Sequence, residues 1–106
     1  MINNKICGLL GLAMRAGKIS FGTEACMQEI ERNRIKLLII ATDASERTKM
    51  KFNSICSNKK IPILEILSIE EISNSIGKSN KAMVGIKDSN FSSEIIKIIN
   101  GGEAIG

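Results

Sequence analysis

The sequence predicts one α/β domain, a three-layer α/β/α sandwich with a mixed, largely parallel central sheet of about four strands. Two observations predict this fold class. Helical and strand patterns alternate from one end of the chain to the other, as they do in sandwiches of this kind. Residues 37–40 read Leu-Leu-Ile-Ile, a continuous apolar run typical of a strand buried on both faces. The 106 residues suit a single domain, 1–106, with one modest core.

The first half of the chain predicts two helices and two strands. Residues 3–15 carry Leu, Ile, Ala and Met at helical spacing, and Gly17 lies just beyond them. A brief strand is expected over 19–21. A helix follows over 23–34, with a few apolar positions for the core and charges elsewhere. The buried strand then extends over 36–41.

The middle of the chain predicts a capped helix and a further strand. Asp43 and Ser45 are the expected caps of a helix over 46–59, because short polar side chains accept hydrogen bonds from the first helical N–H groups. Pro62 opens the next strand, over 63–67, at a position where proline is tolerated.

The last third predicts a short helix, a strand and a final helix. Ser68 and Glu71 have the spacing of a capping box, and Gly77 is the expected C-terminal cap of the helix that they begin. A strand is expected over 82–86. The last helix follows the polar residues 88–90 and is stopped by an Asn-Gly-Gly sequence, after which the tail is expected to fray.

The net charge is +4 and is unevenly distributed. Residues 1–60 hold 11 Lys and Arg against 5 Asp and Glu, whereas residues 61–106 hold 4 against 6. A basic half favours a polyanionic partner, with nucleic acid first. The alternative is an ordinary solubilising surface charge, and composition leaves both open.

Several function classes are disfavoured by residues that the sequence lacks. It has no His, so the usual general base and the commonest zinc ligand are missing. Three Phe and no Trp or Tyr argue against recognition by stacking of single-stranded bases. No apolar run approaches 18 residues and no N-terminal signal is visible, so we expect a cytoplasmic chain without membrane segments. We also expect no metal and no cofactor.

The three cysteines, Cys7, Cys26 and Cys56, are an odd number at wide spacing. This pattern predicts neither a disulfide framework nor a metal-binding pair. Cys26 lies near a predicted helix N-terminus, which lowers a thiol pKa. With no His to act as a base, burial as a small apolar side chain is the favoured interpretation for all three.

Two phosphate motifs fail on inspection. Gly11 to Lys18 resembles a phosphate-binding loop, but five residues rather than four separate Gly11 from Gly17, and Ile19 follows the lysine where Ser or Thr is required. Asp43 follows a buried strand as a phosphoacceptor would, but no acidic pair is available to hold the divalent metal. Its interpretation as a helix cap is favoured.

The junction at Gly22 is the feature that best suits a ligand. A strand breaks at this glycine and a helix begins directly after it. Without a Cβ, the glycine backbone can come close to a bulky partner. The helix N-terminus offers unpaired N–H groups and a partial positive charge, which suit a phosphate-bearing molecule.

Three polar patches follow the first and second strands and precede the last strand. In an alternating sheet they could gather along one edge of the sandwich. Each patch taken alone is also typical of a solvated turn. The patches are Gly22, Thr23 and Glu24 with Gln28; Asp43, Ala44 and Ser45 with Lys49; and Gly77, Lys78, Ser79, Asn80 and Lys81.

An ordered set of short segments suggests a known family. The chain opens with GLLGLAMRAGK over residues 8–18, and Gly22-Thr23, the buried strand with its Asp-Ala-Ser turn, Lys60-Ile61-Pro62 and Gly77 follow in order. From residue 9 to residue 86 this order resembles the L7Ae/L30e/Gadd45 superfamily of ribosomal proteins. The opening segment is similar to that of its small bacterial branch, the YlxQ-like proteins.

The resemblance implies an α/β/α sandwich that binds RNA, typically a kink-turn or a related internal loop. In the family a Gly-Thr-Asn-Glu-x-x-Lys motif opens the second helix. Its glycine lets the backbone approach the RNA, its Asn and Glu read guanine edges, and its Lys contacts phosphate or base. This chain keeps Gly22 and Thr23 but has Glu24, Ala25 and Gln28 at the other three positions.

The hypothesis from the sequence is a non-catalytic protein that binds structured RNA, ribosomal or otherwise non-coding, with ribosomal proteins as further partners. Glu24 and Gln28 would read base edges. Phosphates would be neutralised by Lys49, Lys78 and Lys81, with Arg15 and Lys18 as outer contacts. Two alternatives stay open. One is a protein-interaction module that keeps the sandwich without the RNA site. The other, an enzyme, has the least support, since no acid–base pair or phosphate loop was found.

Overall fold

The computed structural model describes residues 2–101 and shows the alternation of helices and strands that the sequence predicts. The expected fraying of the tail falls on residues 102–106, outside the described part of the chain. In order, the elements are α1 (Ile2–Arg15), β1 (Ile19–Phe21), α2 (Thr23–Glu31), β2 (Leu37–Ile40), α3 (Glu46–Lys59), β3 (Ile63–Glu65), α4 (Ile69–Ile76), β4 (Met83–Ile86) and α5 (Ser89–Ile99).

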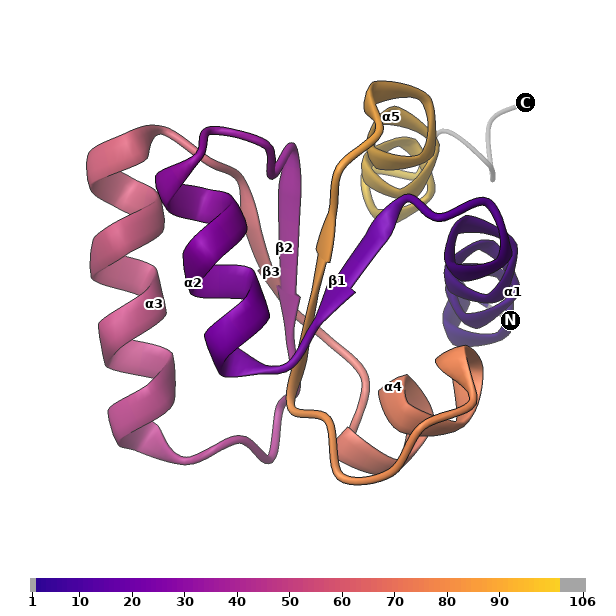
Figure 1. Ribbon diagram of the computed structural model, residues 1–106. Helices are drawn as coiled ribbons and strands as arrows, with labels where there is room; N and C mark the ends of the chain where they lie inside the picture. The colour runs from indigo at the N-terminus through magenta and orange to yellow at the C-terminus, as the bar shows by residue number, and fades with distance from the viewer. Residues whose placement is uncertain (1, 102–106) are drawn as a thin grey trace.

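The elements form the predicted three layers. Figure 1 shows α2 and α3 on one face of the sheet and α1, α4 and α5 on the other. Every residue of β2 and β4 is buried, because both faces of these central strands are covered by helices. The apolar run of β2 therefore marks the centre of the core, as its composition predicts.

The sheet is mixed, as predicted, but it is not largely parallel. Its strand order is β1-β4-β2-β3. Only β2 and β3 pair in parallel, whereas β4 is antiparallel to both β1 and β2. The long helix α3 returns the chain across the sheet before β3, but α4 has only eight residues. Figure 1 shows that, after α4, the chain is still at the end of the sheet where β3 finished. The next strand, β4, therefore starts at this end and runs in the direction opposite to β3.

This topology defines two ends of the sheet. At the lower end, as drawn in Figure 1, β1, β2 and β3 finish and β4 begins. At the upper end the reverse holds. Backbone hydrogen bonds connect the start of β4 to the two turns beside it at the lower end. The Gly22 N–H donates to the Met83 carbonyl at 3.1 Å, and the Ala41 N–H donates to the Ala82 carbonyl at 2.8 Å.

Most helix boundaries follow their predicted caps, and one cap differs. Ser45 caps α3, and Ser68 with Glu71 forms the capping box of α4. The prediction that Asp43 also caps α3 is wrong. Its carboxylate instead accepts the Ile69 N–H of α4 at 2.8 Å, because the turn after β2 lies beside the start of α4 rather than over the start of α3.

Three elements end earlier than predicted, of which β2 is shorter by only one residue at each end. The second helix stops at residue 31 because Asn33 adopts a left-handed conformation, with φ of 58°. The third strand stops at residue 65, and Leu67 then turns the chain with φ of 66°. Asn adopts this conformation more readily than most residues, whereas nothing in the local sequence indicates it at Leu67.

Gly85 lets α2 and its following loop pack closely on β4. A Cβ built at this position would lie 2.6 Å from Ile35 Cδ1 and 3.6 Å from Cys26 Sγ. Both neighbours are buried, so the space for a methyl group is filled by the tip of the isoleucine.

We expect G85A to overpack this contact and to lower the free energy of unfolding by about 1–3 kcal/mol. I35V alone removes the Cδ1 methyl and is expected to cost about 0.5–1.5 kcal/mol. In the double variant the new methyl occupies the vacated space, so its loss should be smaller than the sum of the two single losses. Urea unfolding of the three variants measures this coupling. Strict additivity would show that the two groups do not compete for space.

Candidate nucleic-acid interface

Gly22 holds a backbone conformation that favours glycine strongly. Its φ of 85° and ψ of 162° lie in a region that residues with a Cβ essentially avoid. Among residues 2–101, the only group beyond the chain neighbours within 4 Å of a built Cβ is the Lys81 side chain, whose Cδ lies at 3.9 Å. The backbone at this turn is therefore open to a close approach from outside. A bulky substitution would both fill this space and strain the chain by about 1–3 kcal/mol.

The start of α2 has donors available for a ligand. No side chain caps the helix N-terminus, so its first N–H groups are without a side-chain partner and carry the positive end of the helix dipole. Thr23, Glu24 and Gln28 are exposed there. Together with Met27 and Lys51 they line a shallow hollow. The arrangement offers a carboxylate acceptor and an amide that both donates and accepts.

The turn after β2 is held by Lys49. Its Nζ donates to the Thr42 carbonyl at 2.6 Å and lies 3.0 Å from a Glu65 carboxylate oxygen and 3.5 Å from one of Glu46. The side chain is only 12% exposed. The hydrogen bond to Glu65 is the main cause that raises the pKa of Lys49 above its ordinary value. Lys49 thus joins α3 to the turn and to β3, and its ammonium already has three oxygen partners.

Ser45 lies in the same turn and is also engaged. Its hydroxyl oxygen accepts the Thr48 N–H at 3.2 Å, and the same hydroxyl donates to the Thr48 hydroxyl at 2.9 Å. The residue remains exposed. It therefore shapes the entry of the turn into α3 while its outer side stays accessible.

The loop from Gly77 to Lys81 is fixed by buried Ser73. The Ser73 hydroxyl accepts the Lys81 N–H at 2.8 Å and faces the Lys81 carbonyl at 3.4 Å. The Lys78 N–H donates to the Ser73 carbonyl at 2.9 Å. Within the loop, Asn80 has a left-handed φ of 55°. A serine on α4 therefore sets the path of a polar loop whose own side chains are mostly exposed.

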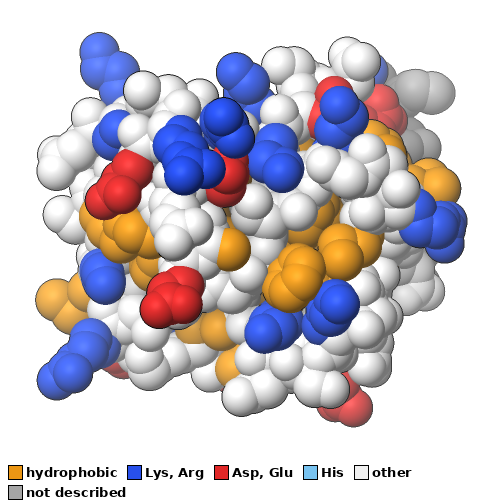
Figure 2. Space-filling model, in the orientation of Figure 1, with side chains coloured by type: hydrophobic (Ala, Val, Ile, Leu, Met, Phe, Trp, Pro, Cys, Tyr) orange, Lys and Arg blue, Asp and Glu red, His pale blue; other side chains and the backbone are white. Residues whose placement is uncertain are grey.

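Two lysines of this loop sit over an aromatic ring. The ammonium groups of Lys78 and Lys81 lie 5.2 and 5.5 Å from the centroid of the Phe21 ring, within the range of cation–π attraction. Phe21 is the last residue of β1 and directly precedes Gly22. In Figure 2 an orange hydrophobic patch is flanked on its lower side by basic side chains. The contact places two positive charges beside the open glycine turn.

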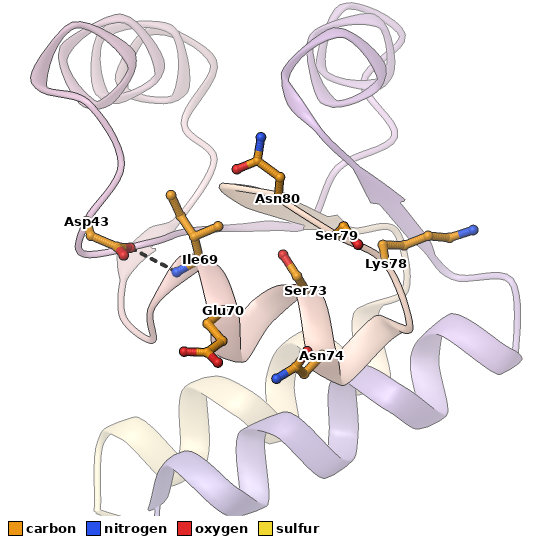
Figure 3. Close-up of a pocket in the computed structure, with 8 residues that line it drawn as sticks. All are labelled: Asp43, Ile69, Glu70, Ser73, Asn74, Lys78, Ser79 and Asn80. Carbon is orange, nitrogen blue, oxygen red and sulfur yellow. Dashed lines mark hydrogen bonds between the residues drawn. The ribbon is translucent and has the colours of Figure 1, made fainter.

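A second hollow, of about 460 Å³, lies between α4, this loop and the turn after β2. In Figure 3 the polar side chains of Asn80 and Ser73 project toward it, and the bond from Ile69 to Asp43 closes one side. Its lining mixes donors and acceptors, with acidic groups at one side and a lysine at the other. The lining residues are Asp43, Ile69, Glu70, Ser73, Asn74, Lys78, Ser79 and Asn80.

The structure brings the three predicted patches together at the lower end of the sheet. It does not bring Arg15 and Lys18 with them, because these residues lie at the other end of β1, before it begins. Two residues that sequence reasoning missed support the patches: Phe21 under the lysines and Ser73 behind the loop. The position of Phe21 directly before a glycine turn was a signal that sequence reasoning could have used. Ser73 had no such signal, because its hydrogen-bond partner, Lys81, is eight residues away.

Cys26 and Cys56 are buried, as expected from the sequence, whereas Cys7 is half-buried. Cys26 is fully buried, and burial raises the pKa of its thiol to about 12. The thiol therefore stays protonated, and the predicted packing role is confirmed over that of a nucleophile. Within residues 2–101 no three His, Cys, Asp or Glu side chains are grouped as metal ligands would be. No helix in the same range is long and apolar enough to cross a bilayer.

The fold and the lower end of the sheet together define the class of protein. It is a small α/β/α sandwich in which a glycine turn, an uncapped helix N-terminus and a polar loop lie side by side. A sequence model of the ribosomal protein L7Ae/L30e/S12e/Gadd45 family matches residues 4–96. The chain belongs to this family. The resemblance that its ordered segments suggest is thereby confirmed.

Individual relatives are similar over most of their length. The chain is 39% identical over 97 residues to "RNA-binding protein YlxQ" of Enterococcus faecium, covering 92% of this chain and 93% of that protein. It is 30% identical over 99 residues to "Large ribosomal subunit protein eL8" of Thermoplasma volcanium, covering 92% and 82%.

Solved structures agree on the fold. A protein of unknown function from Bacillus halodurans C superposes with a TM-score of 0.87 at 30% identity, covering 91% of this chain and 97% of that one. A 15.5kD RNA binding protein of Giardia lamblia superposes with a TM-score of 0.78, covering 99% and 90%. At 18% identity, the second likeness speaks for the fold alone.

The contacts of Lys49 predict a pH-dependent contribution to stability. Because its pKa is raised in the folded chain, this contribution is present below the ordinary lysine pKa of about 10.4 and is lost as the pH rises through the higher folded value. We expect K49M to be less stable than the wild type at neutral pH, with the difference in unfolding free energy shrinking above about pH 10.4. Urea unfolding across this range measures it.

The exposed Lys97 of α5 provides a matched control, because no carboxylate among the described residues pairs with it. K97M should show little change in stability at any pH. A loss in K49M that stays constant from neutral to strongly alkaline pH would contradict the role of the charged ammonium.

Proposed function

We propose that the chain binds structured RNA without catalysis, and that its target is a kink-turn or a related internal loop in ribosomal or other non-coding RNA. The lower end of the sheet is the proposed contact surface. The observation that carries the proposal is the juxtaposition of an open glycine turn, an uncapped helix N-terminus and two lysines over Phe21. The name of the Enterococcus relative, an RNA-binding protein, and membership of a ribosomal-protein family support it.

Each part of this surface suits a different part of an RNA. The free N–H groups at the start of α2 suit a phosphate oxygen, since helix N-termini attract anions. The carboxylate of Glu24 can accept hydrogen bonds from the amino group of a guanine, and the Gln28 amide can pair with a base edge in either sense. Lys78 and Lys81 supply the charge for backbone phosphates. An internal loop suits this surface because its bases are not stacked away in a regular helix.

The held turns support this interpretation through preorganisation. Lys49 and Ser45 fix the turn after β2, and Ser73 fixes the polar loop. A surface that is already ordered loses less conformational entropy when a ligand binds. Lys49 is thus proposed to position the surface rather than to neutralise a phosphate, because its ammonium is already surrounded by oxygen atoms.

The direct test is a gel shift with a kink-turn RNA, the same RNA with its internal loop mutated, and a plain duplex. We expect the kink-turn RNA to bind best. K78Q/K81Q should weaken all binding and lower the slope of log K against log salt by about one to two, because up to two phosphate contacts are lost. K97Q is the control for the loss of charge alone. Equal binding to all three RNAs would show that the surface is basic but does not recognise a specific RNA structure. Binding to none of them would favour the protein-interaction alternative.

A second test restores the residues that the family places after the glycine turn. The variant E24N/A25E/Q28K replaces exposed Glu24 and Gln28 and half-buried Ala25, and it adds a cation where the chain has an amide. We expect it to bind the kink-turn RNA at least tenfold more tightly than the wild type, a gain of about 1.4 kcal/mol, with little change for the plain duplex. Filter binding at one salt concentration measures both. A variant that gains equally on the duplex would contradict a role of these positions in reading bases.

A further inference from the structure

The upper end of the sheet carries a lysine at three neighbouring strand ends. Lys18 directly precedes β1, Lys87 directly follows β4, and Lys36 directly precedes β2. These strands are adjacent, in the order β1-β4-β2. We call these three residues the lysine row. It lies at the end of the sheet opposite to the proposed RNA surface, and it includes the Lys18 that the sequence had suggested as an outer contact.

The three lysines occupy matching positions in the sheet. Ile86 pairs with the first residues of both β1 and β2, so Lys87, one residue further, stands opposite both Lys18 and Lys36. Hydrogen bonds continue the ladder to this point. The Lys87 N–H donates to the Lys18 carbonyl at 2.8 Å, and the Lys36 N–H donates to the Ile86 carbonyl at 2.7 Å. Neighbouring strands are about 4.8 Å apart, so three lysine backbones lie side by side across the sheet.

The row has no internal compensation for its charge. Like charges at directly opposite positions of a sheet repel one another. Within residues 2–101, no carboxylate forms an ion pair with any of the three lysines. The nearest acidic neighbour in sequence, Asp88, accepts the Phe91 N–H at 2.9 Å and caps α5. Lys18 and Lys36 are exposed and Lys87 is half-buried.

A helix dipole favours Lys18, which follows the C-terminal end of α1, but it does not explain the position of Lys87. Basic residues are favourable at helix C-termini, which accounts for Lys59 and Lys60 at the end of α3. Lys87 has the opposite environment, because it lies two residues before the positive N-terminal end of α5. A cation there adds to the local positive potential. A bound anion would relieve both this repulsion and that within the row.

The basic surface continues beyond the row. Lys36 also lines a hollow with Lys59 and Lys60. There the Lys59 ammonium donates to the Asn33 side-chain carbonyl at 3.2 Å, which joins the ends of α2 and α3. Figure 2 shows several Lys and Arg side chains over the upper part of the face in view, with fewer Asp and Glu side chains among them. The row is therefore part of a broader positive surface rather than three isolated charges.

We propose that the lysine row is a second anion-binding surface, which holds the phosphate backbone of an RNA segment distinct from the one bound at the lower end. The inference rests on the proposed function, which supplies RNA as the partner. An RNA strand presents its charges in a line, and three lysines on adjacent strands offer it a row of positive charges. Lysine suits such contact because it acts as a point charge on a flexible stem. An RNA already held at the lower end would also raise the local concentration of its flanking segments.

The test measures binding of a labelled plain RNA duplex by fluorescence anisotropy, with and without saturating kink-turn RNA, at about 50 and 200 mM salt. The full chain is compared with K18Q/K36Q/K87Q and with K18R/K36R/K87R. We expect the wild type and the arginine variant to bind the duplex even when the kink-turn RNA is present. The glutamine variant should lose this binding, with a salt slope lower by about two to three. Because repulsion is removed, it should unfold at no lower temperature than the wild type.

The outcomes separate this inference from the proposed function. Unchanged duplex binding and salt slope in K18Q/K36Q/K87Q, together with a loss of kink-turn binding in K78Q/K81Q, would overturn the lysine row and leave the proposed function in place. Failure of every form of the chain to bind kink-turn RNA, with duplex binding that still depends on the row, would overturn the kink-turn target and support the row. Displacement of the duplex by a polyglutamate peptide at equal charge concentration would overturn the assignment of the row to RNA.

Discussion

The insertion of β4 between β1 and β2, antiparallel to both, is the constraint on which the rest of the structure depends. It brings the finish of β1 and β2 to the start of β4, and backbone hydrogen bonds to Met83 and Ala82 join all three. Had β4 run parallel to its neighbours, the loop before it would lie at the opposite end of the sheet. The glycine turn and the two lysines over Phe21 would then be separated by the length of the strands.

Around this constraint, each turn at the lower end is fixed by a different short-range device. The glycine turn relies on a conformation that other residues avoid, the turn after β2 on the ammonium of Lys49, and the polar loop on the hydroxyl of Ser73. These devices leave the outward side chains exposed, because the stabilising bonds are made by the backbone or by residues behind it. Rigidity and accessibility are thus combined at the same place, which is what a surface for recognising a shaped ligand requires.

The elements were predictable from local signals, and their arrangement was not. Capping residues, helical spacing and the apolar run of β2 located every element and most boundaries to within about two residues, since these effects act within a few residues. The direction of β4 depends on whether α4 carries the chain back to the other end of the sheet. No local sequence pattern encodes this. The same reason explains the missed bond from Asp43 to α4, 26 residues away in sequence, and the role of Lys49. The family resemblance indicated where to expect a site, but the contacts of its residues came only from the packing.

The strand that gathers the lower surface also creates the charge at the upper end. Because β4 finishes between the starts of β1 and β2, its last lysine falls between theirs, and the register that aligns Gly22 with Met83 also aligns Lys87 with Lys18 and Lys36. The two ends are therefore not independent features of the surface. They are connected through three short strands buried in a rigid core, which fixes their separation. With RNA as the proposed ligand of both, the domain would act as a short spacer that sets the distance between two RNA segments.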